Sequence, residues 1–360
     1  MLEAPYPFDY EVPRRLVAQE PLRHRADARL MLVDRGRQAI DHYHVRDLPH
    51  LLSAGDRLVL NDTKVIRAQL AGVRTQTGGR WQGLFIEATP DGHWRILCKT
   101  RGRLNAGEAI TLRDREGRLN VKLLLIERLE EGQWLAHADA EEPTDTLLEQ
   151  LGRVPLPPYI RGGNMVDDDV ASYQTVYAQR PGAIAAPTAG LHFTRELLKT
   201  LDAHGVGLSR VTLHVGLGTF RPIESESLNE HRMHGEWCEI TAATAAELNQ
   251  TRASGGRIVA VGTTVVRTLE TAVRSAIANG APSRNARETV PWQGSTDLFI
   301  RPPFEFRAID ALMTNFHFPR TTLLVLVQTF AGPELIAEAY RQAIREEYRF
   351  YSYGDAMLIV

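Results

Sequence analysis

Hydrophobic positions follow two different patterns along the chain. Between residues 66 and 138, apolar and polar residues alternate in short segments, which Gly, Asp and Asn interrupt. The six segments are IRAQLAGV, RWQGLFIEA, HWRILCKT, EAITLR, NVKLLLIERL and QWLAHA. Alternation with a period of two is typical of half-buried strands, and closely spaced strands separated by turn residues are typical of small all-β domains. We therefore predict a small antiparallel barrel or sandwich in this region.

The second pattern, from residue 183 onward, alternates apolar strand-like runs with helical runs. Strand-like runs such as SRVTLHVGLGTF and RIVAVGTT precede helical runs such as AATAAELNQTRASG and VVRTLETAVRSAIANG. Such alternation is typical of a parallel α/β layer. Residues 153–162, RVPLPPYIRG, predict an extended return linker, because proline disfavours helix. We predict a mixed, largely parallel α/β domain of residues 1–60 and 150–360, into which an antiparallel β-barrel domain, residues 61–149, is inserted.

Composition excludes several classes of protein. The 42 Lys and Arg against 44 Asp and Glu give a net charge of −2, which rules out a histone-like polycation. The two cysteines, Cys98 and Cys238, are too few for a disulfide scaffold or a Cys-based zinc site. The acidic, proline-broken start and the short apolar run at 323–327 predict no signal peptide and no membrane span, so we expect a cytoplasmic protein.

Charge is unevenly distributed in spite of this balance. Residues 61–105 contain eight Lys or Arg against three Asp or Glu, a local excess of five. This asymmetry indicates either a polyanionic partner or a solvated barrel face.

Four predicted strand ends lead directly into small and polar residues. They are APTAGLHFT (186–194), HVGLGTF (214–220), GTTVVR (262–267) and TNFHFP (314–319). Ligands of open α/β sheets bind outside the carboxyl ends of the strands, where helix N-termini present free N–H groups. An ordinary strand-to-helix turn explains Gly262 equally well, and GLGTFR lacks the third glycine of a dinucleotide fingerprint.

Histidines are frequent near these loops, where they are candidates for proton transfer near neutral pH. Five lie in or beside the loops, namely His192, His214, His231, His234 and His317. His231 and His234 could share a helical face and bind a metal, but no third ligand and no HExxH pattern accompany them, so we expect no metal site. The sequence contains no P-loop and no GxSxG nucleophile motif, which disfavours NTP hydrolysis and serine hydrolysis.

Ordered sequence blocks resemble one known family nearly end to end. The blocks include DRLVLNDTKVIRAQL, RVPLPPYIR, PGAIAAPTAGLHFT, VTLHVGLGTFRPI, VAVGTTVVRTLE, TNFHFPRTTLLVLV and YRFYSYGDAMLI. In these the chain is similar to the S-adenosylmethionine:tRNA ribosyltransferase-isomerases of queuosine biosynthesis. The resemblance implies an α/β domain with an inserted β-barrel. It also implies transfer and isomerisation of the ribosyl moiety of S-adenosylmethionine onto the 7-aminomethyl-7-deazaguanine at the tRNA wobble position, giving epoxyqueuosine-tRNA, adenine and methionine.

This reaction needs two proton transfers and a cradle for S-adenosylmethionine, which is consumed as a co-substrate, so no separate cofactor is expected. The catalytic candidates are His192, His214, His317 and Asp355, the last as a carboxylate that could favour the sulfonium or orient a histidine. The candidates for binding S-adenosylmethionine are Thr188, Gly190, Gly216, Gly218, Thr219, Gly262, Thr263 and Arg267. Among them Arg267 could pair with the methionine carboxylate or be a surface helix residue.

The expected partner is a tRNA that carries the 7-deazaguanine precursor, bound by a monomer. Candidates for binding it are Lys64, Arg67, Arg101, Arg103, Arg153, Tyr159 and Arg161, at the barrel entry, its strand ends and the linker. Without the resemblance, an S-adenosylmethionine-dependent RNA methyltransferase would be the next enzyme to consider, although the glycine-rich turn of that class is missing. A non-catalytic RNA-binding protein would explain the basic segment but not the histidine-rich strand ends.

Overall fold

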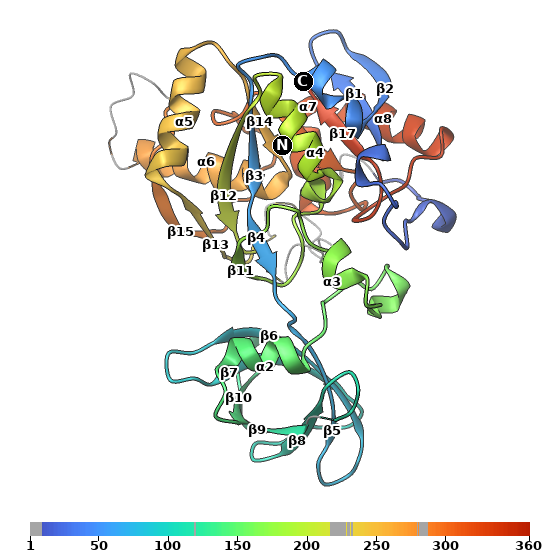
Figure 1. Ribbon diagram of the computed structural model, residues 1–360, viewed down its shortest axis with the longest axis vertical. Coiled ribbons are helices and arrows are strands. Elements are labelled where there is room, and N and C mark those ends of the chain that lie inside the picture. Colours follow the sequence, from blue (N-terminus) through green and yellow to red (C-terminus); the bar gives the residue numbers. More distant parts are fainter. Residues whose placement is uncertain are drawn as a thin grey trace. The chain divides into compact units, whose positions relative to one another are not determined.

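The computed structural model describes residues 9–118, 120–216, 228, 231, 233–278, 280 and 287–360. Its internal contacts divide the chain into two units (Figure 1). The α/β unit contains residues through Lys64 and Ala171–Val360, and the barrel unit is Val65–Val170. Residues 150–170, which we expected in the α/β domain, belong by contacts to the barrel unit. The N–H of Arg153 donates to Gln69 O (2.8 Å) and the N–H of Gln69 donates to Arg153 O (3.0 Å), and these two bonds join the segment to the first barrel strand.

The α/β unit is built on a mixed sheet. Among the described residues nine strands pair in the order β15-β13-β12-β3-β14-β16-β17-β1-β2. They are β1 (Arg29–Asp34), β2 (Ala39–His44), β3 (Arg57–Asn61), β12 (Gly207–Leu213), β13 (Glu236–Ile240), β14 (Ile258–Val261), β15 (Trp292–Thr296), β16 (Ala311–Asn315) and β17 (Ala356–Ile359). The central strands β12, β3, β14 and β16 are mutually parallel, and antiparallel strands lie toward both edges. The predicted mixed α/β domain is confirmed.

Helices cover this sheet, and three of them have a threonine N-cap. The longer ones are α4 (Arg195–Ala203), α5 (Ala242–Ala253), α6 (Thr263–Ala278), α7 (Thr322–Ala331) and α8 (Pro333–Arg345). Thr194, Thr241 and Thr321 each accept a hydrogen bond from a backbone N–H in the first turn of α4, α5 and α7. Among the described residues no single helix is long and apolar enough to cross a membrane; only α7 and α8 counted together, bent by 115°, pass that test by length and composition.

Short elements complete the α/β unit and its connections to the barrel. They are η1 (Arg14–Leu16), η2 (Arg25–Asp27), η3 (Val45–Asp47), α1 (Leu48–Leu51), β4 (Thr63–Val65), α3 (Asp169–Ser172), β11 (Arg180–Ala183) and η6 (Thr188–His192). One core cluster joins alternate residues of the central strands, such as Leu58, Val261 and Met313, to Phe193 and Leu197 at the start of α4. This apolar contact positions α4 on the sheet face (Figure 1).

The barrel unit contains the six strands that the alternating pattern predicts. They are β5 (Gln69–Arg74), β6 (Arg80–Ala88), β7 (Trp94–Thr100), β8 (Ala109–Arg113), β9 (Asn120–Arg128) and β10 (Gln133–Asp139). Antiparallel pairing in the order β10-β7-β6-β5-β8-β9 closes the barrel, so the prediction of a barrel or sandwich resolves to a barrel. The unit also holds η4 (Glu130–Gly132), α2 (Thr144–Leu151) and η5 (Arg161–Gly163). The indole of the buried Trp94 donates to Thr144 Oγ1 (3.0 Å), which fastens α2 to the barrel.

Candidate functional site

The four parallel strands at the centre of the sheet end at one edge, and a polar or small residue lies at each end. His214 follows β12, Asn61 ends β3, Gly262 follows β14 and Asn315 ends β16. Three of the four predicted loops therefore meet at the carboxyl edge, the usual ligand-binding address of such sheets. The fourth forms the 3₁₀ helix η6, which contacts β16 at the same edge.

Asn61 links three segments at this edge. Its amide nitrogen donates to Leu213 O (3.0 Å) and Thr264 Oγ1 (3.2 Å), and its Oδ1 accepts from the N–H groups of Leu213 (3.0 Å) and Thr63 (3.2 Å). The side chain is fully buried, so these bonds hold the ends of β3 and β12 and the start of α6 in register. We did not predict this residue. The available signal was the run LVLNDT, in which polar residues follow a buried strand.

His214 is the half-buried histidine of the edge. Its Nδ1 lies 2.8 Å from Thr63 Oγ1, and its ring stacks on Trp237 with a centroid distance of 5.0 Å. Gly182 faces the ring so closely that a Cβ there would lie 2.8 Å from Nε2. Within the described residues Nε2 has no hydrogen-bond partner. Burial, followed by the charge of Arg180, lowers the pKa of His214, so the ring is a neutral base at pH 7.

His192, at the end of η6, is a buried neutral imidazole. Its Nε2 accepts a hydrogen bond from Asn315 Nδ2 (3.2 Å), and the same Nδ2 donates to Tyr351 O (3.1 Å), which fixes the orientation of the amide. Burial, with the charges of Arg25 and Arg349, lowers the pKa of His192 to about 4. The ring is therefore held without charge at neutral pH.

His317, which follows β16, is a buried histidine beside two tyrosines, Tyr10 and Tyr340. Its ring Nε2 is 2.8 Å from Thr314 Oγ1. Its backbone N–H donates to the Tyr340 hydroxyl (2.8 Å), and its backbone carbonyl accepts from the Tyr10 hydroxyl. Burial lowers the pKa of His317 to about 3. These contacts hold together the segment after β16 and helix α8.

Asp355 does not orient a histidine, in contrast to one of our two expectations for it. One carboxylate oxygen accepts from the N–H of Arg29 (2.9 Å) and the other from the N–H of Arg349 (2.7 Å). The side chain is 2% exposed, and burial raises its pKa. Because both oxygens bind backbone donors of other segments, the geometry gives Asp355 a structural role between β1 and the turn before β17.

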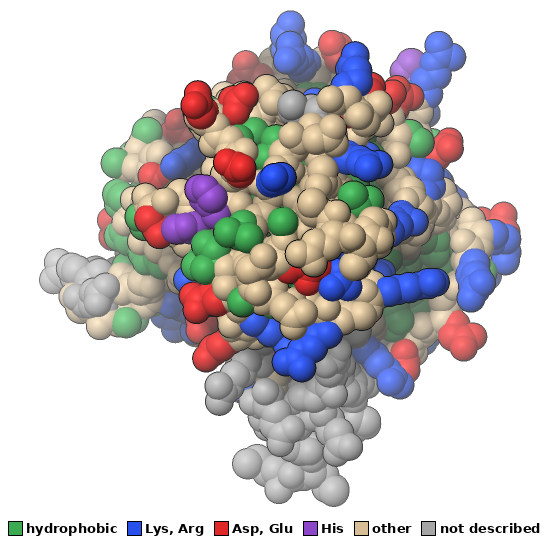
Figure 2. All heavy atoms as spheres, turned by 90° about the horizontal axis from the view of Figure 1, so that it is seen from below, with side chains coloured by type: hydrophobic (Ala, Val, Ile, Leu, Met, Phe, Trp, Pro, Cys, Tyr) green, Lys and Arg blue, Asp and Glu red, His purple; other side chains and the backbone are tan. Residues whose placement is uncertain are grey.

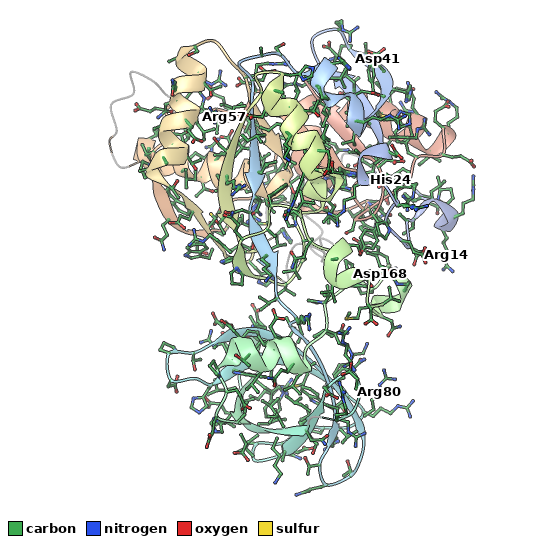
Figure 3. All side chains as sticks on the ribbon, viewed as in Figure 1. Arg14, His24, Asp41, Arg57, Arg80 and Asp168 are labelled. Carbon is green, nitrogen blue, oxygen red and sulfur yellow. The ribbon has the colours of Figure 1, made fainter. Side chains whose placement is uncertain are left out.

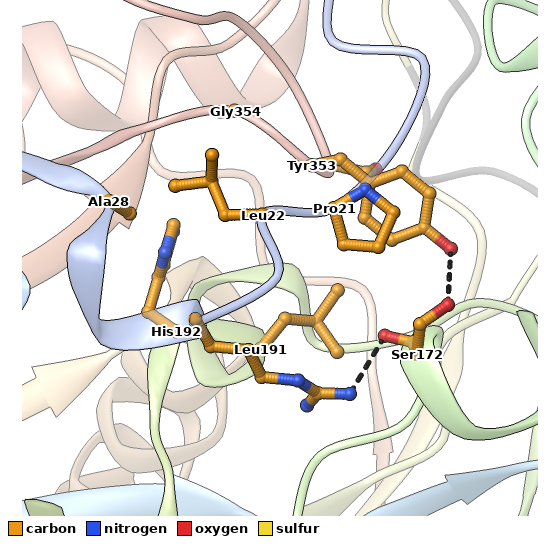
Figure 4. Close-up of a pocket in the computed structure, with 10 residues that line it drawn as sticks. Pro21, Leu22, Ala28, Ser172, Leu191, His192, Tyr353 and Gly354 are labelled. Atoms are coloured by element: carbon orange, nitrogen blue, oxygen red, sulfur yellow. Dashed lines mark hydrogen bonds between the residues drawn. The ribbon is translucent and has the colours of Figure 1, made fainter. Parts of the chain in front are cut away.

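A small pocket opens beside His192 (Figure 4). Arg25 lines it and donates to Ser172 O (3.1 Å), and the Ser172 hydroxyl lies 3.3 Å from the Tyr353 hydroxyl. Its volume of about 20 Å³ suits one water molecule. The pocket is thus a small polar recess beside the carboxyl edge and is too small for a nucleoside. Sequence reasoning missed Arg25 because it lies far from every strand-end loop.

Most candidates for binding S-adenosylmethionine lie at the carboxyl edge. Thr188 begins η6, and Gly216 lies two residues beyond His214. Gly262, with φ of 95°, follows β14 and precedes Thr263, which begins α6. This conformation favours glycine at position 262. Gly218 and Thr219 lie outside the described residues.

Gly190 is constrained by a buried tyrosine. A Cβ at this position would lie 2.1 Å from Tyr177 Oη, so no other residue fits without a shift. Tyr177 Oη, Thr175 Oγ1 and Asn315 Oδ1 are buried polar atoms that have no hydrogen-bond partner within the described residues. Such atoms are rare in folded proteins and often mark functional places.

Arg267 is a buried residue of α6, so it is not the surface helix residue that was one of our two expectations for it. It is 4% exposed, pairs with Glu236, and donates to Thr296 O (3.1 Å) and Leu298 O (3.2 Å). Each of its three nitrogens thus has a partner within the α/β unit. Glu236 in turn accepts from the N–H of Gly216 (2.8 Å), so the ion pair positions the loop after β12.

The residues predicted to bind tRNA have different surroundings. Arg101, Arg103 and Lys64 are exposed. Arg67 donates to the backbone of Glu149, and Arg161 pairs with the buried Asp169. Arg153 and Tyr159 are partly buried in the barrel unit. The exposed side chains are available to a partner, whereas Arg67 and Arg161 already stabilise their own unit.

No metal centre is formed by the described residues, in which no three His, Cys, Asp or Glu side chains gather to hold an ion. His231 and His234 do not lie on a helix, so they do not share the helical face on which a metal site would depend. The ring of His231 instead packs edge-on against Phe299, with a centroid distance of 5.4 Å.

Comparison with known proteins gives matches along nearly the whole chain. The profile of the family described as "Queuosine biosynthesis protein" matches residues 6–359. The S-adenosylmethionine:tRNA ribosyltransferase-isomerase of Symbiobacterium thermophilum is 46% identical over 354 residues, which cover 98% of each chain. The protein of the same name from Cereibacter sphaeroides is 46% identical over 359 residues, also 98% of each chain. Among solved structures, the S-adenosylmethionine tRNA ribosyltransferase of Thermotoga maritima is 36% identical and matches with a TM-score of 0.53, covering 98% of this chain and 100% of that one.

Proposed function

Because the chain belongs to the queuosine biosynthesis protein family, we propose that it is an S-adenosylmethionine:tRNA ribosyltransferase-isomerase. The enzyme transfers the ribosyl moiety of S-adenosylmethionine to the 7-aminomethyl-7-deazaguanine at the tRNA wobble position and isomerises it. The products are epoxyqueuosine-tRNA, adenine and methionine. The observation that carries this proposal is similarity to enzymes of that name over 98% of the chain.

The reaction requires a base and an acid. The sulfonium makes the neighbouring ribose C5′ acidic, so a base can remove a proton there, and adenine leaves more easily when an acid protonates its ring. We assign the base to His214, since it is the half-buried histidine of the edge and its Nε2 is unoccupied within the described residues. When Nδ1–H donates to Thr63 Oγ1, Nε2 carries the lone pair that accepts the proton.

His192 and His317 suit a different task. Burial lowers their pKa values to about 4 and about 3, and one nitrogen of each ring lies at hydrogen-bond distance from a neighbouring side chain. Both rings stay neutral at pH 7, so neither is an acid for the departing adenine. We assign them to positioning the loops on which S-adenosylmethionine rests.

S-adenosylmethionine is proposed to bind along the carboxyl edge as a consumed co-substrate, without a resident cofactor. Thr188, Gly190, Gly262 and Thr263 supply small side chains and the first N–H groups of α6, which suit the methionine carboxylate or ribose hydroxyls. With Arg267 occupied by Glu236, the carboxylate relies on these N–H groups instead.

A labelling experiment tests the function. The protein is incubated with precursor-modified tRNA and two preparations of S-adenosylmethionine, one labelled in the ribose and one in the methyl group. We expect ribose label in the tRNA and an equal amount of free adenine by mass spectrometry. Transfer of methyl label alone would identify a methyltransferase, and tRNA binding without either label would identify a non-catalytic RNA-binding protein.

A further inference from the structure

The barrel unit contains a polar pocket that lies outside the carboxyl edge. Its volume is about 340 Å³, large enough for a phosphate group and its water. The walls come from β5 and β6, from Arg153 after α2, from the segment 163–167, and from Arg115 in the turn after β8. Three arginines, Arg80, Arg115 and Arg153, therefore face one space.

Four polar side chains of this pocket have no partner in the described part of the chain. The guanidinium groups of Arg80 and Arg153 form no hydrogen bond and no ion pair, and neither do the side-chain amides of Gln69 and Gln82. Figure 3 shows Arg80 extending from the barrel. Donors that converge on a cavity without being used within the protein are suited to an external acceptor.

The surrounding carboxylates leave the pocket positive. Asp114 and Glu116 act on Arg153 only through space, without an ion pair. Arg115 pairs with Asp167, whose side chain is 91% exposed. An exposed ion pair of this kind contributes little to stability, so an incoming anion can replace the carboxylate. Asp167 thus indicates where an anionic oxygen is accommodated.

The segment that carries Asp167 is held in place before any ligand arrives. The buried Asp169 accepts from the N–H of Val166 (2.7 Å) and pairs with Arg161, and Met165 Sδ accepts from the N–H of Val154 (3.2 Å). A preformed wall lowers the entropic cost of binding.

We propose that this pocket binds one phosphate group of the tRNA backbone, with Arg80 and Arg153 as the principal donors. Guanidinium groups match phosphate oxygens in a bidentate geometry, which a set of three arginines can exploit. Figure 2 shows Lys and Arg side chains interspersed with Asp and Glu on one face of the molecule rather than a continuous basic patch. A discrete phosphate site would provide affinity for RNA on a surface whose overall charge does not favour it. The proposal rests on tRNA being the substrate, as proposed above.

The test compares Arg80→Gln, Arg153→Gln and their combination with the control Arg128→Gln, which removes an exposed arginine of β9 outside the pocket. Binding of fluorescently labelled precursor-modified tRNA is measured from 50 to 200 mM KCl. Loss of this one phosphate contact in the double variant should lower the log–log salt slope by about 0.7 to 0.9, and each single variant should lower it by part of that amount. For the double variant, the factor by which tRNA affinity falls below that of wild type should therefore shrink about threefold between 50 and 200 mM KCl. Slopes equal to that of the control would overturn the proposal.

A further variant that is expected to increase tRNA affinity separates loss of the site from simple misfolding. Asp167→Asn removes the competing carboxylate and frees Arg115, so it should tighten tRNA binding, a result that a damaged fold cannot produce. Unchanged or weaker binding would contradict the proposal. Adenine release is measured separately at saturating tRNA: if the wild type releases none, the proposed function fails, while the binding data still decide whether the pocket holds a phosphate.

Discussion

Two buried histidines should make the α/β unit sensitive to mild acid. His192 and His317 are 5% and 9% exposed, and burial lowers their pKa values from the ordinary 6.5 to about 4 and about 3. At pH 8 both rings are neutral in the folded and unfolded states and cost nothing. As the pH falls below 6.5, the unfolded chain takes up protons that the folded chain refuses, so stability is lost until the folded pKa values are reached.

The size of the effect follows from these pKa values. Between pH 8 and pH 5 the free energy of unfolding falls by about 2 kcal/mol for each histidine and by about 4 kcal/mol for the two together. Because a typical domain is stable by only about 5–15 kcal/mol, this loss is a large share of the total. Depressed carboxylate pKa values, such as that of Asp56, act mainly below pH 5, whereas the raised pKa of Asp355 acts in the opposite sense to the histidines. The difference between wild type and a variant that lacks one histidine therefore isolates the histidine effect.

The assay is urea unfolding at pH 8 and pH 5, followed by hydrogen exchange of β16 peptides so that the α/β unit is observed alone. His317→Gln keeps a polar group near Thr314 but removes one titration, so its loss between the two pH values should be about 2 kcal/mol smaller than that of wild type. His24→Gln, at an exposed position of the same unit, serves as the control. An equal pH-dependent loss in His317→Gln and wild type would refute the reasoning.

Three further predictions concern the carboxyl edge. His214→Ala should lower single-turnover adenine release about 10²- to 10⁴-fold with little change in melting temperature; full turnover would make His214 structural. Gly190→Ala should destabilise by about 1–3 kcal/mol in thermal unfolding because its Cβ meets Tyr177 Oη, and the added change Tyr177→Phe should recover part of that loss if the hydroxyl is the obstacle. Asn61→Ala should cost about 1–3 kcal/mol for each polar group of Leu213 left unpaired, which denaturant unfolding measures; a smaller cost would mean that water replaces the amide.

The elements of both units could be predicted because their signals are local. Alternation with a period of two identified all six barrel strands, and strand-like runs followed by small residues placed three loops at one edge. Barrel closure was not predictable, since the pairing of β5 with β8 and of β10 with β7 joins strands that are not neighbours in the chain. Whether residues 150–170 stay with the barrel depends likewise on the long-range pair of Arg153 and Gln69.

Side-chain roles were less predictable because they depend on partners from elsewhere. Arg267 occurs in a helix that follows a glycine turn, a setting that equally suits a ligand contact or an exposed residue. Its actual partner, Glu236, begins a strand that precedes it by 31 residues in the chain, and nothing in either local pattern marks the pair. Asp355 is similar, because its acceptor atoms are used by N–H groups of Arg29 and Arg349.

The three histidines of the loops show why residue type alone does not assign proton chemistry. A base must exchange a proton with the substrate, which requires a ring nitrogen that is both unoccupied and accessible. His317 and His192 are buried, which lowers their pKa values to about 3 and about 4 and keeps both rings neutral and enclosed. His214 is only half-buried, and its Nε2 has no hydrogen-bond partner in the described residues. These differences arise from segments far apart in sequence, so the assignment of the base to His214 depends on the fold rather than on the motif.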